Sequence, residues 1–277
     1  MMKKHTVLYS IIILLLFFCF PEVIISSSTS YYFRTLGIND GLSQSTVNAI
    51  LQDQKGFMWI GTKDGLNQYD GQECRVFQKE NSSLGNNFIT ALYEDCEGYI
   101  WVGTDAGVYI YNPVQEAFQF LDTEIASSGE KITRAVTWIT SDSQNNIWIS
   151  VDNQGLFCYN RGKKNLTKVV SCGKSGIANV THFWFYAGQL WIARYEDNLY
   201  VSKDNSSFNA FNDVDGEDIF KGLVINSYVE GLHNCLYVGT SKGLMEINLT
   251  SRKVRKLLDE YVRDICFRSD TDLWIGT

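Results

Sequence analysis

Several residue types that build common functional sites are scarce in this chain of 277 residues. Its seven cysteines include no CxxC pair, and it has only two prolines and three histidines. A metal site made of paired cysteines is therefore excluded, and a chain of this length does not need a disulfide framework. We expect most of the cysteines to be small buried apolar residues, and we predict no metal and no cofactor.

Basic charge is also in short supply. No run of five basic residues occurs, and the formal net charge is −7. Nucleic acids and anionic membranes bind surfaces rich in Lys and Arg, so neither is a predicted partner of this surface. The motif HExxH and the P-loop are absent as well. A glycosidase stays open as an alternative, because it needs two facing carboxylates that linear spacing does not reveal.

Hydrophobic residues, aromatics and glycines are abundant. Hydrophobic residues make up 45% of the chain and aromatic residues 14%, and there are 22 glycines. This composition can bury a large core, and it is typical of many short strands joined by tight turns. We therefore expect an all-β fold.

Residues 1–28 differ from the rest of the chain. Positive charges at Lys3 and Lys4 precede an apolar run from Ile11 to Phe20, and small residues follow at Ser26, Ser27 and Ser28. That order is typical of a secretory signal peptide. The apolar stretch also approaches the roughly 20 residues that span a bilayer, so an uncleaved N-terminal membrane anchor is the alternative. Both interpretations place residues 29–277 outside the cytoplasm.

One short phrase recurs at intervals of about 40 to 45 residues. In each copy a strand-like run and a polar turn precede an aromatic residue, and a glycine turn and two more strand-like runs follow it. Four short strands at this period are typical of a β-propeller blade. Residues 29–277 are thus predicted to form a partial β-propeller of four-stranded antiparallel blades, centred on Trp59, Trp101, Trp148, Trp191, Tyr237 and Trp274.

A small residue stands two positions after each of these aromatics. The residue type changes between copies but its size does not, which indicates that neighbouring blades crowd together at this point. The positions are Gly61, Gly103, Ser150, Ala193, Gly239 and Gly276. The following turn carries residues that tolerate positive φ, namely Gly65, Gly107, Gly155, Asn198 and Gly243.

An aspartate precedes the tryptophan by six residues in the first three copies, at Asp53, Asp95 and Asp142. We interpret these residues as structural, each accepting hydrogen bonds from the backbone amides of its own turn. The Asp-box of sialidase propellers has a spacing of five, so the two motifs differ. Later copies have Gly231 and Arg268 at this position, which disfavours a calcium loop or a catalytic carboxylate. The aromatics are predicted to be core residues between blades.

The chain accommodates five complete blades and the first half of a sixth. Residues Tyr32 to Thr35 are similar to a fourth strand, so we expect them to form the outermost strand of the last blade and to close the ring. A ring cannot close on half a blade. We therefore expect a longer protein, in which the complete ring has seven blades.

The segment NDGLSQSTVNAILQDQKGFMWIGTKDGLNQYDG resembles the repeat of two-component regulator propellers, which form the extracytoplasmic part of bacterial hybrid histidine kinase sensors. The resemblance covers residues 32–277 and is strongest in the first two copies. It implies a periplasmic, homodimeric sensor of oligosaccharide, whose inner-membrane anchor lies in a segment absent here or at the N-terminus. It also implies a cytoplasmic kinase, of which this chain contains no part, so this portion is not expected to be an enzyme.

Ligand contacts are expected where loops converge at one end of the ring axis. The links into first strands and the turns between second and third strands should emerge on the same face. Their polar side chains suit sugar hydroxyls, or are ordinary loop residues. They include Asn39, Asp40, Ser43, Gln44, Asn86, Asn87, Lys63, Asp64, Asp105, Asp152, Asn153 and Glu196.

The third and fourth copies depart most from the repeat. Trp138 and His182 stand where the first two copies have Ala49 and Ala91, and Arg194 replaces a threonine. Departures from a repeat can mark functional positions, although divergence without function explains them equally well. The predicted ligand contacts are Trp138, His182, Arg194 and Tyr195. A protein-interaction scaffold remains an alternative function, as does a glycan-active lyase or glycosidase.

Overall fold

Each repeat folds into antiparallel strands whose order in the sheet follows their order in the chain. The computed structural model describes residues 32–169, 180–205, 207–212, 214–269 and 272–277. Residues 36–277 form one unit and residues 1–35 another. The predicted export segment, residues 1–28, lies outside the described residues. In the part that is described, no helix is long and apolar enough to cross a membrane.

Five sheets have four strands and one has two, which confirms the predicted five blades and half of a sixth. A short 3-10 helix, η1 (Ile38–Asp40), precedes them. The sheets are β1 (Val47–Gln52), β2 (Met58–Thr62), β3 (Gly65–Tyr69) and β4 (Cys74–Phe77); β5 (Ile89–Glu94), β6 (Ile100–Thr104), β7 (Gly107–Asn112) and β8 (Ala117–Phe120); β9 (Val136–Ser141), β10 (Ile147–Val151), β11 (Gly155–Asn160) and β12 (Asn165–Lys168); β13 (Val180–Tyr186), β14 (Gln189–Arg194), β15 (Leu199–Ser202) and β16 (Asn209–Ala210); β17 (Ile225–Glu230), β18 (Cys235–Thr240), β19 (Gly243–Asn248) and β20 (Val254–Leu258); and β21 (Asp264–Ser269) with β22 (Asp272–Gly276).

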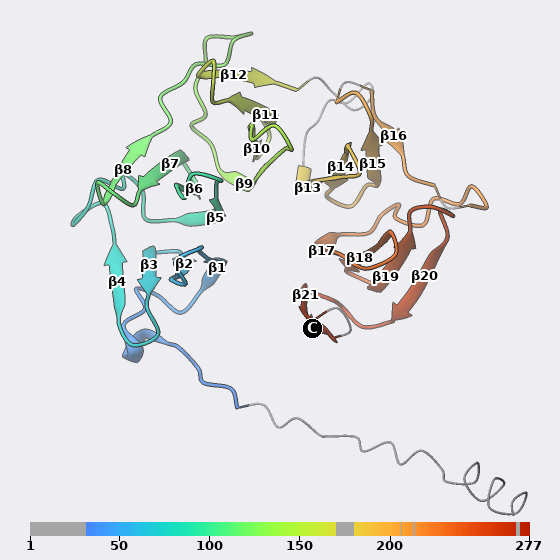
Figure 1. Ribbon diagram of the computed structural model, residues 1–277, viewed down its shortest axis with the longest axis horizontal. Coiled ribbons are helices and arrows are strands. Elements are labelled where there is room, and N and C mark those ends of the chain that lie inside the picture. Colours follow the sequence, from blue (N-terminus) through green and yellow to red (C-terminus); the bar gives the residue numbers. More distant parts are fainter. Residues whose placement is uncertain (1–31, 170–179, 206, 213, 270–271) are drawn as a thin grey trace, which may run out of the picture. The chain divides into compact units, whose positions relative to one another are not determined.

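Within residues 36–277 the sheets stand in chain order around a central axis, with the first strand of each sheet innermost (Figure 1). A separate hydrophobic cluster fills the space between each sheet and the next. Trp59, Trp101, Trp148 and Trp191 are each buried in one of these clusters, and Tyr237 packs against the last one. The prediction that the repeated aromatics are core residues between blades is confirmed at these positions.

In the first three sheets the small residue after the aromatic faces the first residue of the next sheet. A Cβ atom at Gly61 would lie 2.6 Å from Cγ2 of Ile89, and one at Gly103 would lie 2.8 Å from Cγ1 of Val136. Both distances are far shorter than a van der Waals contact. In the third sheet Ser150 fits because its hydroxyl donates to the Val180 carbonyl at 3.1 Å. The predicted crowding between blades is therefore confirmed.

The aspartate turns also form as predicted. Oδ1 of Asp53 accepts hydrogen bonds from the backbone N–H groups of Lys55 and Phe57, at 3.0 and 2.9 Å. Its other oxygen, Oδ2, accepts the indole N–H of Trp59 at 2.8 Å. Asp95 and Asp142 repeat the pattern, with indole bonds of 2.7 and 2.9 Å. The sequence analysis predicted the bonds within the turn but not the bond to the indole.

The fifth sheet compensates for the lost aspartate, which the sequence analysis did not recognise. Tyr237 replaces the tryptophan there, and its hydroxyl donates to Glu246 Oε1 at 3.1 Å. A Cβ atom at Gly231 would lie 2.5 Å from the Tyr237 ring, so the aromatic ring requires a glycine where the aspartate stood. Acid and indole are thus replaced together.

Links and turns emerge on one face, as predicted. The turn residue Gly65 donates its N–H to the Asn87 carbonyl of a link at 2.7 Å, and Asp152 and Ser241 make the same kind of bond at 2.8 Å each. Four turn glycines have positive φ, but the prediction is wrong for Asn198. In that longer turn the positive φ lies at Glu196, while the Asn198 side chain accepts the N–H of Leu199 at 2.7 Å.

Two further predictions fail. Of the described cysteines none is buried: Cys96 and Cys266 are exposed, and Cys74, Cys158 and Cys235 are partly exposed. Cys96 lies in a turn, and Cys74 and Cys235 begin strands β4 and β18. Cys158 and Cys266 lie within β11 and β21, and Cys158 packs against the cluster between the third and fourth sheets. Residues 32–37, which include the predicted closing strand, contain no strand. The last sheet has only two strands, β21 and β22, so it lacks the third strand with which a closing strand would pair.

Candidate functional site: an axial cavity

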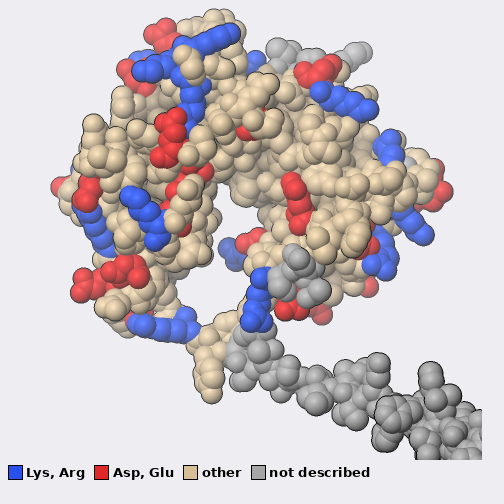
Figure 2. Space-filling model, viewed as in Figure 1, with Lys and Arg blue, Asp and Glu red and all other residues tan. Residues whose placement is uncertain are grey.

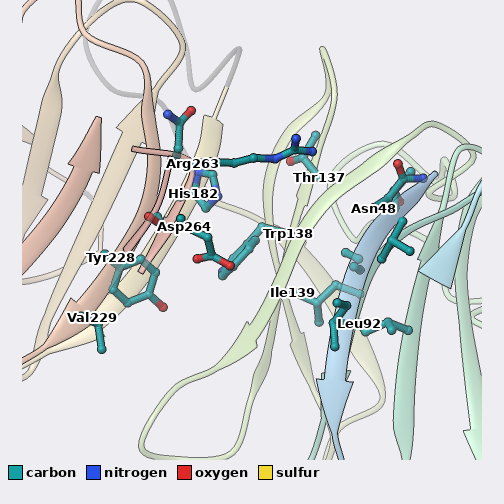
Figure 3. Close-up of a pocket in the computed structure, with 18 of the residues that line it drawn as sticks. Asn48, Leu92, Thr137, Trp138, Ile139, His182, Tyr228, Val229, Arg263 and Asp264 are labelled. Carbon is teal, nitrogen blue, oxygen red and sulfur yellow. The ribbon is translucent and has the colours of Figure 1, made fainter. Parts of the chain in front are cut away.

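The innermost strands of the six sheets border one cavity of about 770 Å³. Figure 2 shows it as a hollow at the centre of the sheets, and Figure 3 shows part of its lining. Its volume lies within the range of about 300 to 1,000 Å³ that is usual for small-molecule sites. The ring axis, where the sheets converge, is therefore a place where a ligand can be enclosed.

A β-bulge lies near the start of five of these strands, and in three of them the bulged residue has a polar side chain that donates to the next sheet. Asn48 Nδ2 donates to the Ile89 carbonyl at 2.8 Å, and Asn226 Nδ2 donates to the Val262 carbonyl at 2.7 Å. Thr137 makes the same kind of bond to Val180 at 3.2 Å. These bonds fix β1, β9 and β17 against the sheets that follow them and so help to define the cavity wall.

The residue after the bulge differs most between sheets. The strand pairing places these residues opposite the small residues described above, and so confirms the alignment of Trp138 and His182 with the two alanines. Side chains at this position face the cavity. In chain order they are Ala49, Ala91, Trp138, His182, Ser227 and Asp264. One side of the cavity wall is therefore small and apolar, and the other is large and polar.

Trp138 and His182 lie together, with ring centroids 4.7 Å apart, and Tyr228 lies 6.4 Å from Trp138. Burial lowers the pKa of His182 from 6.5 to about 4, although a hydrogen bond to the Ile225 backbone opposes the shift. The imidazole is therefore neutral at pH 7, and one of its two nitrogens can accept a hydrogen bond. Figure 3 shows Trp138 and His182 among the side chains that line the cavity.

Four polar atoms in this wall are buried without a hydrogen-bond partner among the described residues. They are Thr90 Oγ1, Trp138 Nε1, His182 Nδ1 and Ser227 Oγ. Buried polar atoms nearly always have a partner, because an unpaired one costs about 1 to 3 kcal/mol. They present an indole donor, an imidazole acceptor and two hydroxyls that can do both. This set matches a ligand with several hydroxyl groups.

Charged groups border the same cavity. Arg263 and Asp264 contribute from the sixth sheet, and Glu230 from the end of β17. Burial raises the pKa of Glu230, and burial together with the charge of Glu230 raises the pKa of Tyr228. The cavity thus has no uniform charge, which suits a neutral polar ligand better than an ion.

The other two predicted contacts lie elsewhere, in the turn between β14 and β15. Arg194 forms an ion pair with Asp197 at 2.8 Å, and its guanidinium lies 5.7 Å from the Tyr200 ring. Tyr195 is 53% exposed. Neither residue lines the axial cavity. The structure therefore brings together two of the four predicted residues, and a ligand role for Arg194 and Tyr195 stays a prediction.

Several lining residues were missed by the sequence analysis. Ser227 and Asp264 occupy the same repeat position as Trp138, so extending that comparison to the fifth and sixth copies would have found them. Arg263 had no comparable signal, since the equivalent residues in other copies are Asn or Thr. Among the residues that the structure describes, no cluster of His, Cys, Asp and Glu could hold a metal ion.

Comparison with known proteins identifies the repeats. Residues 41–64 and 83–106 match the family described as Two component regulator propeller. These segments are two-component regulator propeller repeats. They contain the first two phrases on which the sequence resemblance was based, including Trp59 and Trp101.

Two further similarities agree with this. Histidine kinase P4 of Formosa agariphila is 40% identical over 53 residues, which is 19% of this chain and 4% of the kinase. The extracellular domain of the putative hybrid two component system BT3049 from B. thetaiotaomicron superposes with a TM-score of 0.74 at 27% identity. That match covers 90% of this chain and 34% of the other, so the chain spans about a third of that domain's length.

A further structure shares the fold alone. Virginiamycin B lyase from Staphylococcus aureus superposes with a TM-score of 0.62 at 11% identity, over 83% of this chain and 77% of the lyase. The same propeller architecture therefore occurs both in extracellular domains of two-component systems and in an enzyme.

Proposed function

We propose that this regulator propeller is a ligand-sensing portion of a periplasmic sensor that belongs to a hybrid two-component histidine kinase. The longer protein would be anchored in the inner membrane and act as a homodimer. Its kinase modules would lie outside this chain. The proposal is supported by the family of the repeats and by the likeness to the extracellular domain of a hybrid two-component system.

The ligand proposed for the axial cavity is an oligosaccharide or another small polar molecule. The observation that carries this proposal is the set of four unpartnered polar atoms, one of them on Trp138, among the residues that line the cavity. Aromatic faces and hydroxyl-bonding groups together are what a sugar ring requires. A ligand that touches the first strands of several sheets would also couple their positions, which is one way to transmit binding to the rest of a sensor.

A glycan array followed by calorimetry tests this proposal on the chain and on the full sensor. For the oligosaccharide that binds, Trp138→Ala should weaken affinity by about ten-fold or more, because the stacking surface and the indole donor are both lost. Val114→Ser is a matched control, since Val114 is 89% exposed and lies outside the cavity. Equal affinity of Trp138→Ala and wild type would contradict the axial site.

The two alternative functions give different results in the same experiment. A glycosidase or lyase would change the mass of the recovered oligosaccharide, whereas a sensor returns it intact. A protein-interaction scaffold would bind none of the glycans. Tyr195→Ala distinguishes the two places where ligand contacts were predicted. This variant should bind more weakly only if the ligand binds at the β14–β15 turn and not in the axial cavity.

A further inference from the structure

Two equivalent cavities lie at the outer side of the sheets, away from the axis. One lies between the second and third sheets and the other between the fourth and fifth, each of about 640 Å³. Strand pairing establishes the equivalence, because Trp101 pairs with Ile110 and Trp191 pairs with Val201, and all four line these cavities. Any chemical difference between the two cavities therefore reflects substitutions at matched positions or a change in the length of a matched turn.

The first of these cavities contains its own carboxylate. Asp95 Oδ2 accepts the indole N–H of Trp101 at 2.7 Å, and Arg161 Nη1 lies 3.0 Å from the same oxygen. The indole bond does not depend on the arginine. Trp59 and Trp148 donate to their own aspartates at 2.8 and 2.9 Å in the first and third sheets. In this fold the repeated indole is thus a donor to a carboxylate.

The second cavity has the indole but no carboxylate of its own to accept it. In the fourth sheet Tyr186 pairs with Gln189, so that the turn between β13 and β14 has only Ala187 and Gly188. This turn is too short to contain the aspartate that the longer turns carry. The Trp191 side chain is 2% exposed, and its Nε1 has no hydrogen-bond partner among the described residues. The donor is therefore buried and unpaired in a cavity wall.

The surroundings of the unpaired donor suit an anion. Lys203 and Arg252 line the cavity, while Asp204 is the acidic residue in the lining. Asp204 accepts hydrogen bonds from the hydroxyl groups of Ser202 and Ser207, at 3.0 and 2.8 Å. These bonds occupy much of its hydrogen-bonding capacity, and the two cations outnumber it. Hydrogen bonds from a neutral donor to a carboxylate are stronger than those to a neutral acceptor.

We propose that the cavity between the fourth and fifth sheets binds the carboxylate group of a small molecule. The ligand oxygen accepts the Trp191 indole N–H, in the place that Asp95 takes at Trp101. Lys203 and Arg252 supply the positive charge. This site is separate from the axial cavity and does not depend on the ligand proposed there.

The indole N–H signals of the tryptophans in a ¹⁵N-labelled chain provide a direct test. Sodium acetate is titrated at constant ionic strength, with acetamide as a neutral probe of the same shape. The Trp191 signal, assigned by its loss in Trp191→Phe, should shift with acetate and saturate, and should move much less with acetamide. The Trp101 signal is the internal control, because its N–H already donates to Asp95. No shift of Trp191 up to the highest acetate concentration, or an equal shift with acetamide, overturns the proposal.

Variants test the same site by affinity. Trp191→Phe keeps an aromatic ring but removes the donor, so acetate should bind about ten-fold more weakly. Lys203→Gln changes an exposed residue that the fold does not require, and it should weaken binding several-fold. Unchanged acetate affinity in Lys203→Gln together with unchanged affinity in Trp191→Phe overturns the site. D-galacturonate and N-acetyl-L-aspartate then distinguish a sugar acid from a peptide-like acid as the source of the carboxylate.

Discussion

At the scale of single residues, the repeated small residue shows how the neighbouring sheet restricts the sequence. A Cβ atom at Gly61 would meet Ile89 of the next sheet at 2.6 Å, whereas one at Gly239 would meet Ser227 Oγ of its own sheet at 2.5 Å and Cγ1 of Val262 at 2.7 Å. A Cβ atom at Gly276 would meet nothing nearer than 3.6 Å, and the atoms in range belong to Asp264 of its own sheet. At Gly61 and Gly103 the crowding therefore comes from the first residue of the next sheet, whereas at Gly239 the nearest atom belongs to its own sheet.

This contrast predicts the effects of two matched substitutions. Gly61→Ala should lower the free energy of unfolding by about 1 to 2 kcal/mol, because the added methyl must displace Ile89. Gly276→Ala should be neutral or stabilising by up to about 1 kcal/mol, since alanine restricts the unfolded chain and meets no clash. Urea denaturation measures both. Similar values for the two variants would show that the sheets tolerate closer side chains than the distances indicate.

At the scale of structural elements, the aspartate turn joins a hairpin to the core between sheets. One carboxylate ties its own turn through Oδ1 and the buried indole through Oδ2. At Asp95, which is 2% exposed, the same group also binds Arg161 of the next sheet at 3.0 Å. Asp53 makes the turn and indole bonds in the first sheet, with Trp59 as its indole partner.

The two hairpins should therefore differ in their sensitivity to loss of the acid. Asp53→Ala should cost about 1 to 2 kcal/mol, because a partly buried indole donor and two turn amides lose their acceptor. Asp95→Ala should cost more, about 2 to 3 kcal/mol, because it also removes the buried one of the two acid partners of Arg161, which keeps only Glu97 at 2.6 Å. Thermal unfolding of the two variants against wild type gives the comparison. An Asp95→Ala variant no less stable than Asp53→Ala would mean that the ion pair contributes nothing.

At the scale of the whole unit, the axial cavity is built by no sheet alone. Trp138 comes from the third sheet, His182 from the fourth and Ser227 from the fifth. Arg263, Asp264, Glu230 and Tyr228 complete the titratable and charged groups of the lining. Because His182 is enclosed by several sheets, its protonation state is linked to the integrity of their arrangement.

Global stability should therefore depend on pH through His182. Its pKa is about 4 in the folded chain and 6.5 as a free group, so below pH 6.5 the unfolded chain binds a proton that the folded chain does not. The free energy of unfolding should fall as the pH drops from about 6.5 to about 4, by up to about 3 kcal/mol. Above this range the contribution is complete.

His182→Gln provides the reference for this measurement. Urea denaturation at about pH 7.5 and about pH 4.5 should show a larger loss in wild type than in the variant. The comparison also removes the opposite contribution of Glu230, whose pKa is raised by burial in both proteins. Identical losses would mean that water reaches the imidazole freely.

Local pattern was sufficient to predict the blades. The period of the aromatic phrase, the turn aspartates and the small residue after Trp59 and Trp101 each express a contact that recurs in several repeats, so the linear sequence records it more than once. The same comparison located Trp138 and His182 at an inner position. It predicted buried cysteines wrongly, because a single Cys96 in a turn has no repeat that reveals its exposure.

Only the tertiary structure decided which unlike residues meet. Arg194 and Tyr195 departed from the repeat as clearly as Trp138 did, yet they lie at a turn, while Thr90, Ser227 and Arg263 face the axis. The unpaired N–H of Trp191 was equally hidden in the sequence, because the missing acceptor becomes apparent only when the matched cavities are compared. Repetition records contacts that every blade makes, whereas a site combines side chains that single blades contribute once, and their proximity follows from the way in which the sheets converge.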